Sequence, residues 1–162
     1  VLAPQADERR WYPGGFDKNL DENQPGLDSA LSIIGSMITR LENRGLSRSR
    51  IVVAGFSQGA CLVLEYLCRF GAGLGGAVAI AGALIGDDAP AKRHDADLSG
   101  VTVLTGIAEE DTWVPLLAVK RTRAHLEELG ATVIAVDHPG AEHTITAEQH
   151  RALAAVLQEV LA

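Results

Sequence analysis

Residues 55–59 read Gly-Phe-Ser-Gln-Gly, a G-x-S-x-G pentapeptide that is typical of a nucleophilic serine. In this motif Ser57 occupies a sharp turn between a strand and a helix, which raises its hydroxyl above the sheet. We expect side chains at the two glycine positions to collide with the neighbouring strand and helix. A β-branched run enters the motif and a segment of helical spacing leaves it, so the context favours a catalytic serine over an idle turn.

A nucleophilic serine needs a base, and two histidines follow the last expected strand, where the base of such a motif belongs. His138 comes directly after that strand and before a proline, whereas His143 lies deeper in the loop, just before the last expected helix. We therefore predict that His143 takes the proton of Ser57. The remaining histidines fall in a polar loop or within helices and are expected to be structural or exposed: His94, His125 and His150.

Three adjacent carboxylates, Glu109, Glu110 and Asp111, follow the apolar run 101–105 and could orient the imidazole of the base. A short aspartate just before a helix suits this task better than an exposed glutamate, but the residue pattern alone leaves the choice open. The backbone N–H directly after the nucleophile, that of Gln58, is the expected oxyanion donor.

The elements that must position these residues alternate along the chain, as short apolar runs and longer segments of helical spacing. Strands are expected over 1–3, 51–55, 77–81, 101–105 and 131–136, all of them buried. Helices are expected over 26–43, 57–70, 115–129 and 147–161. This order predicts one α/β domain over residues 1–162, with a mostly parallel sheet and helices on both faces in three layers.

Functional groups of such a sheet lie in the loops beyond the carboxyl ends of its strands. These loops cover 4–26, 56–58, 82–87, 106–114 and 137–146, and they contain every candidate named above. We therefore expect the site to be assembled along this one edge of the sheet.

Aromatic residues gather in the first of these loops. Trp11, Tyr12 and Phe16 either pack in the core, as aromatic residues usually do, or line a pocket for the acyl or alcohol part of a substrate. Leu84 and Ile85 follow another strand and could add an apolar wall. We take Trp11, Tyr12 and Leu84 as the candidate substrate-binding residues.

Composition excludes several classes of partner. The formal net charge is −7, which argues against nucleic acid or an anionic membrane surface, because phosphate contacts need clustered Lys and Arg. No apolar run approaches the roughly 18 residues of a membrane-spanning helix, so no stable membrane insertion is expected. Cys61 and Cys68 are too far apart along a helix to form a disulfide, which predicts reduced thiols and a cytoplasmic protein.

Two further patterns predict no cofactor and no metal. Residues 71–76 satisfy G-x-G-x-x-G, but they follow a helix and precede a strand, which is the reverse of a dinucleotide site. Several side chains of one polar loop are of metal-ligating type but lack a rigid ligand spacing, so a solvated loop is expected: Asp87, Asp88, His94, Asp95 and Asp97. Cys61, one turn after Ser57, is interpreted as a packed thiol.

Six short stretches, in order and spanning nearly the whole chain, resemble the phospholipase/carboxylesterase family of α/β-hydrolases, which includes acyl-protein thioesterases and small bacterial carboxylesterases. They are Ala-Pro-Gln-Ala at 3–6, Trp-Tyr-Pro at 11–13, Asn-Gln-Pro-Gly at 23–26, the serine motif with its following alanine at 55–60, Asp-x-x-Val-Pro at 111–115 and Pro-Gly-x-x-His at 139–143.

The resemblance implies a serine hydrolase with the nucleophile at Ser57, the acid at Asp111 and the base at His143. It selects Asp111 over the two glutamates, because the family's acid precedes the three residues ending in Val-Pro. The implied reaction is hydrolysis of small or medium carboxylic esters through an acyl-enzyme without a cofactor. Small-molecule thioesters and lysophospholipids are included as substrates.

One departure concerns the second oxyanion donor. The family carries, ahead of the Ala-Pro-Gln stretch, further strands and a Leu-His-Gly-type loop that supplies this N–H group. The sequence opens within an apolar run at Val1, and we expect that an N-terminal portion of the domain is missing from it. A shortened hydrolase and a fragment with little activity are the other interpretations.

An alternative function follows from that departure, and so does an expectation about association. A catalytically impaired binding or scaffold protein, lacking half of the oxyanion hole, is the alternative function. An exposed sheet edge near Val1 is compatible with a homodimer.

Overall fold

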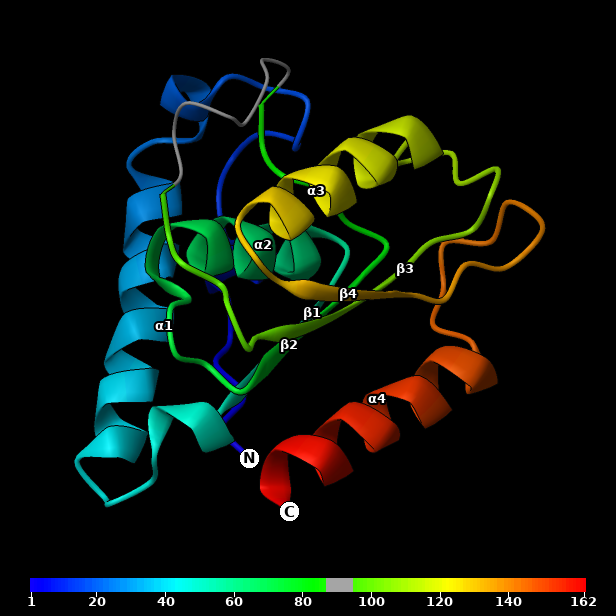
Figure 1. Ribbon diagram of the computed structural model, residues 1–162. Coiled ribbons are helices and arrows are strands. Elements are labelled where there is room, and N and C mark those ends of the chain that lie inside the picture. Colours follow the sequence, from blue (N-terminus) through cyan, green and yellow to red (C-terminus); the bar gives the residue numbers. More distant parts are fainter. Residues whose placement is uncertain (87–94) are drawn as a thin grey trace.

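Four parallel strands form one sheet in the order β1-β2-β3-β4 (Figure 1). The strands are β1 (Val52–Phe56), β2 (Gly76–Ile80), β3 (Thr102–Gly106) and β4 (Thr132–Ala135). They coincide within one or two residues with four of the five expected strands. The carboxyl ends of all four therefore meet at the same edge of the sheet, as predicted.

Four helices connect and follow these strands: α1 (Gly26–Glu42), α2 (Gln58–Phe70), α3 (Leu116–Glu128) and α4 (Ala147–Leu161). Each lies where the spacing of apolar residues predicts a helix. Short 3-10 turns add η1 (Asp7–Arg9), η2 (Leu20–Asn23) and η3 (Arg48–Arg50). Gly45 and Gly130 follow α1 and α3 with φ angles of 86° and 93°, a left-handed conformation that suits glycine after a helix end.

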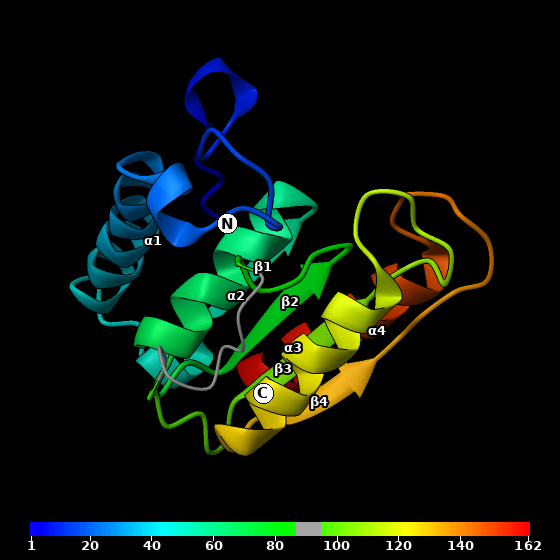
Figure 2. The ribbon, with the colours of Figure 1, turned by 90° about the horizontal axis from the view of Figure 1, so that it is seen from above.

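The sheet is covered on both faces, which gives the expected three layers. Helices α2 and α3 lie on one face, α1 packs outside α2, and α4 lies alone on the other face (Figures 1 and 2). Alternating side chains of β2 serve the two faces: Ala77 and Ala79 join the core under α1 and α2, whereas Val78 and Ile80 join the core under α4. The small alanines permit close approach of the helices.

Two expectations about strands are wrong. Residues 1–3 form no strand and their side chains are exposed, because they pair with no strand of the part of the chain that the structure describes. The strand β1 is not fully buried, since Ala54 and Phe56 are exposed. Its position at the edge of the sheet explains this, as a run of apolar residues cannot distinguish an edge strand from a central one.

The computed structural model describes residues 1–86 and 95–162. Asp87, Asp88 and His94, three of the side chains of metal-ligating type named above, lie outside these ranges. Within them, no three His, Cys, Asp or Glu side chains are grouped as metal ligands would be. Over the same two ranges, each helix is too short or too polar to cross a bilayer.

Candidate active site

The serine motif forms a strained turn between β1 and α2. Ser57 has φ 53° and ψ −123°, a backbone conformation that residues other than glycine rarely adopt and that costs about 1–3 kcal/mol. The Ser57 N–H donates a hydrogen bond of 2.9 Å to the carbonyl oxygen of Ile80 at the end of β2. The turn is thus held from the neighbouring strand, which leaves the Ser57 side chain at the carboxyl edge of the sheet.

The two glycines of the motif differ in how much space a side chain would find at their positions. A Cβ atom on Gly55 would lie 2.2 Å from the carbonyl oxygen of Gly59, so α2 could not start so close to β1 with any other residue there. A Cβ atom on Gly59 would meet only Trp11, with Nε1 at 3.9 Å. The expected collision is therefore confirmed at Gly55 and wrong at Gly59, whose missing side chain would face the loop of residue 11.

Ser57, His143 and Asp111 form a chain of hydrogen bonds. The Oγ of Ser57 lies 2.8 Å from Nε2 of His143, and Nδ1 of His143 lies 2.7 Å from Oδ2 of Asp111. The three residues follow β1, β4 and β3 respectively. When Nδ1 carries the imidazole proton and donates it in a hydrogen bond to Asp111, Nε2 is unprotonated and can accept the proton of the serine hydroxyl.

The Asp111 carboxylate is fixed on its other side as well. Its side chain is 0% exposed, and its Oδ1 accepts hydrogen bonds from the N–H groups of Trp113 at 2.8 Å and Val114 at 2.9 Å. Desolvation acts to raise the pKa of this carboxyl, but the hydrogen bonds from Val114, His143 and Trp113 outweigh it and hold the pKa below its ordinary value. Asp111 is thus held as a carboxylate.

The loops that carry Asp111 and His143 are joined along their backbones, and they lie side by side in Figure 2. The N–H of Glu109 donates to the carbonyl oxygen of His138 at 2.9 Å, and that of Glu110 donates to the carbonyl oxygen of Gly140 at 2.9 Å. The side chains of Glu109 and Glu110 point into solvent. Asp111 is therefore the carboxylate of this triplet that the loop brings to His143.

Further contacts anchor the His143 loop at both ends. At its start, Asp137 accepts hydrogen bonds from both terminal nitrogens of Arg123, whose Nε donates to the hydroxyl of Thr105 at 2.8 Å. At its end, Thr146 caps α4 by accepting from the N–H of Gln149 at 3.2 Å. The His143 ring is thus carried by a loop tied to β3, α3 and α4.

Gln58 contributes to the site in two ways. Its backbone N–H opens α2 and has no carbonyl oxygen of the helix to bind, so it is free to donate to an oxyanion next to Ser57. Its side-chain amide accepts from the N–H of Trp11 at 2.8 Å and donates to the carbonyl oxygen of Tyr12 at 2.9 Å. The sequence contains no local signal for this clamp, which joins residues more than 40 positions apart.

The three candidate substrate-binding residues differ in their burial and in their contacts. Trp11 is partly buried beside the start of α2. Tyr12 is 2% exposed and packs in the core, where burial raises the pKa of its hydroxyl. Leu84 is 6% exposed, and its N–H donates to the hydroxyl of Thr122 at 3.0 Å. Of the two readings weighed for Tyr12, core packing is the one that its position supports.

Two aromatic rings that are absent from the predicted substrate-binding residues lie beside His143. The ring of Phe56 is 5.0 Å from the imidazole, centroid to centroid, and the ring of Trp113 is 6.4 Å away. Phe56 is 36% exposed and Trp113 is 73% exposed. Their positions in the sequence could have indicated them, because Phe56 directly precedes Ser57 and Trp113 comes two residues after Asp111.

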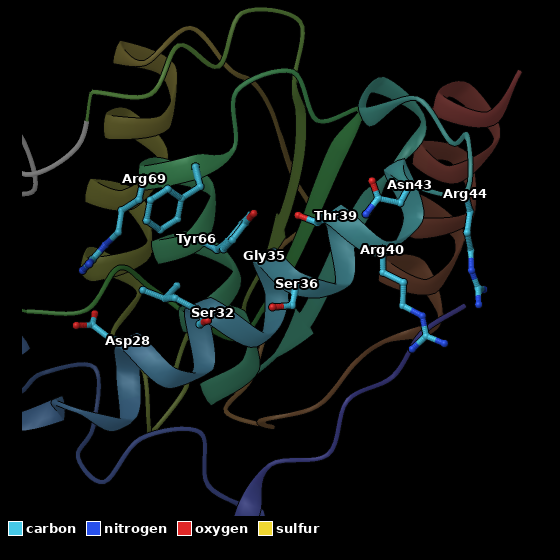
Figure 3. A pocket seen from close by; sticks show the side chains of 12 residues that line it. Asp28, Ser32, Gly35, Ser36, Thr39, Arg40, Asn43, Arg44, Tyr66 and Arg69 are labelled. Atoms are coloured by element: carbon cyan, nitrogen blue, oxygen red, sulfur yellow. The ribbon is translucent and has the colours of Figure 1, made fainter.

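A hollow of about 860 Å³ lies elsewhere, between α1 and α2. Figure 3 shows Arg40 and Arg44 toward one end of it and Asp28 and Arg69 toward the other. None of the hydrogen-bonded residues described above lines it, and its walls contain no group that could act as an activated nucleophile. The chemistry of the site therefore resides at the edge of the sheet.

Known proteins resemble the chain in sequence and in fold. Residues 5–161 match the phospholipase/carboxylesterase family. A phospholipase/carboxylesterase from Dyadobacter fermentans DSM 18053 is 36% identical with a TM-score of 0.88, over 98% of this chain and 75% of that one.

More distant structures share the fold. SOBER1 from Arabidopsis thaliana is 19% identical with a TM-score of 0.78, over 94% of this chain and 74% of that one. A Bacillus cereus carboxylesterase is 19% identical with a TM-score of 0.69, over 90% and 68%. A search of curated proteins gave no match.

These matches agree with the architecture described above. The four-stranded parallel sheet, with helices on both faces and a serine turn between β1 and α2, is the α/β-hydrolase arrangement expected from the sequence. The match to the family covers nearly the whole chain and is accompanied by a solved relative at 36% identity. The chain therefore belongs to the phospholipase/carboxylesterase family of hydrolases.

Proposed function

We propose that the protein hydrolyses carboxylic esters, with Ser57 as nucleophile, His143 as general base and acid, and Asp111 as the orienting carboxylate. The observation that carries this proposal is the unbroken series of hydrogen bonds from the Ser57 hydroxyl through His143 to the buried Asp111 carboxylate. The geometry matches what nucleophilic catalysis by serine requires. Membership of a hydrolase family supports the same reaction class.

The proposed reaction has two steps. The Ser57 oxygen forms a bond to the ester carbonyl carbon while His143 Nε2 accepts the hydroxyl proton, and the Gln58 N–H stabilises the oxyanion. The bond between the carbonyl carbon and the alcohol oxygen then breaks. The alcohol oxygen keeps the electron pair of that bond and takes the proton from His143 Nε2. Water next attacks the acyl-enzyme by the same route and releases the carboxylic acid. This sequence uses no metal ion or cofactor.

Small and medium carboxylic esters are the proposed substrates, with thioesters and lysophospholipids as further members of the class. A reducing, cytoplasmic setting belongs to the same proposal, supported by Cys61 and Cys68, which are both buried and lie too far apart along α2 to form a disulfide with each other. Burial raises the pKa of the Cys61 thiol to about 11, so this thiol beside the nucleophile stays protonated.

Turnover of a short-chain nitrophenyl ester, measured beside labelling with a fluorophosphonate, tests the proposal. We expect wild type to be labelled and active, Ser57→Ala to be neither, and Ser36→Ala to behave as wild type, because Ser36 is an exposed serine of α1. A protein that turns over no ester and takes no label would support the binding or scaffold alternative instead. The family match favours the hydrolase.

A further inference from the structure

The side chains of Phe56 and Trp113, whose rings lie beside His143, take no part in the hydrogen-bonded chain of the site. Trp113 is the most exposed aromatic side chain among the exposed large apolar residues of the described ranges. Its backbone is held in place, because the main-chain N–H of Trp113 donates a hydrogen bond to Oδ1 of Asp111. A large apolar ring that lies beside the proposed base on an anchored backbone, and that is open to solvent, is suited to cover an apolar part of a bound molecule.

The position of His143 decides which part of the ester meets these rings. The imidazole must return its proton to the oxygen of the departing alcohol, which requires that oxygen to lie about 3 Å from Nε2. The carbonyl oxygen is the part that the backbone N–H of Gln58, at the start of α2, is proposed to bind. The rings, whose centres lie 5.0 and 6.4 Å from that of the imidazole, are therefore on the His143 side of the site, beside the departing alcohol.

The charges of the two loops around the rings restrict the kind of alcohol further. The loops 106–114 and 137–146 contain no lysine or arginine, and they expose the carboxylates of Glu109, Glu110 and Glu142. An alcohol that carries a phosphate or carboxylate would be repelled there, and none of its negative charges would find a cation in either loop. Lysophospholipids, whose leaving alcohol carries a phosphate, are therefore expected to be the poorest substrates of the proposed class. A neutral, apolar alcohol gains contact with the rings at no such cost.

We infer that Phe56 and Trp113 form the leaving-group subsite, and that it selects esters of neutral aromatic or extended apolar alcohols, or the corresponding thiols. This inference rests on the proposed function, since it assigns the alcohol side of the same reaction. Phe56 and Trp113 act on specificity through contact with the alcohol, whereas the hydrogen-bonded residues act on the reacting atoms.

A matched pair of butyrate esters tests it, one of benzyl alcohol and one of methoxyethanol, whose oxygens are of similar basicity. We expect kcat/KM of wild type to favour the benzyl ester by about tenfold or more. Trp113→Ala and Phe56→Ala should bring the ratio close to one. Phe70→Ala, which removes an exposed aromatic ring from the far end of α2, should leave the ratio as in wild type.

A second series, of methoxyethyl esters with acyl chains of increasing length, separates the two sides of the substrate. Trp113→Ala should keep the acyl-length profile of wild type. An unchanged benzyl preference in both ring variants, or an altered acyl-length profile instead, would overturn the inference. Fluorophosphonate labelling of every variant distinguishes the failures: unlabelled wild type refutes the esterase proposal itself, whereas labelled variants with an unchanged ratio refute only the subsite.

Discussion

The reactivity proposed for Ser57 depends on neighbours that are fixed before a substrate arrives. Its backbone is strained, its hydroxyl is bound to His143, and the orienting Asp111 is buried with hydrogen bonds on both oxygens. No side chain in this series needs to rearrange for the proton to move from Ser57 to His143. Pre-organisation of this kind removes orientation costs from the chemical step.

The lowered pKa of Asp111 gives a pH-dependent prediction. A carboxyl whose folded-state pKa lies below the ordinary value of 3.8 stabilises the native state above that pH, and the contribution is lost as the pH falls through the folded-state pKa. We therefore expect urea unfolding to show a steeper loss of stability below about pH 4 in wild type than in Asp111→Asn. Parallel curves for the two proteins in this range would contradict the prediction.

The side-chain clamp of Gln58 gives a second prediction at this scale. Gln58→Met keeps the length of the side chain but removes both hydrogen bonds to residues 11 and 12. We expect kcat for a nitrophenyl ester to fall about ten- to a hundredfold, because the oxyanion N–H sits on the same residue and its position loosens. Gln5→Met, at an exposed position, serves as control and should keep wild-type kcat. Equal kcat values would show that the clamp has no bearing on the reaction.

At the scale of elements, the site is built from three strand ends and two loops tied together by backbone hydrogen bonds. The Asp111 loop after β3 and the His143 loop after β4 form one unit in this arrangement, since the N–H groups of Glu109 and Glu110 donate to carbonyl oxygens of the His143 loop. Arg123 of α3 ties that unit to the sheet, because its guanidinium binds both Asp137 and Thr105. Displacement of either loop would therefore separate His143 from Ser57.

Arg123→Lys tests this anchoring. A lysine supplies one point charge where the planar guanidinium binds Asp137 with two nitrogens and Thr105 with a third. The pair is largely buried, so we expect the free energy of unfolding in urea to fall by about 2 kcal/mol. Arg121→Lys changes an exposed arginine of the same helix and should cost less than about 0.5 kcal/mol. Similar losses for both variants would contradict the anchoring role.

Much of this arrangement was predictable from the sequence, for a physical reason. Apolar periodicity reports burial directly, so the helices and four strands lie where expected, and the carboxyl edge of a parallel sheet then collects Ser57, Asp111 and His143. Contacts between distant side chains have no such periodic signal. The Gln58 clamp on residues 11 and 12 and the rings around His143 therefore emerged only from the structure.

At the scale of the whole molecule, the described sheet has two edge strands, β1 and β4, and β1 is the one that leads into Ser57. The strand β1 pairs only with β2 among the described residues, and Ala54 and Phe56 on it are exposed. Unpaired backbone groups on an exposed edge strand are a template for pairing with a second chain. The exposed surface near the site thus combines an apolar subsite with a strand edge.

We expect the 162-residue chain to associate through this edge as its concentration rises. Ala54→Lys places a charge on the edge strand and should shift the protein toward monomer in sedimentation velocity. Ala124→Lys, at an exposed position of α3, adds the same charge away from the edge and should leave association as in wild type. Identical sedimentation of all three proteins at every concentration would exclude β1 as an association surface.

The most direct test of the central claim is the mass of the Ser57 peptide after wild type is mixed with a nitrophenyl butyrate and quenched rapidly in acid. An acyl-enzyme on Ser57 predicts a peptide heavier by one butyryl group, together with a burst of nitrophenol equal to the amount of protein. The modified peptide and the burst should both be absent in Ser57→Ala. Undiminished ester turnover by Ser57→Ala, or a butyryl group on a residue other than Ser57 in wild type, would contradict the assignment of Ser57 as the nucleophile.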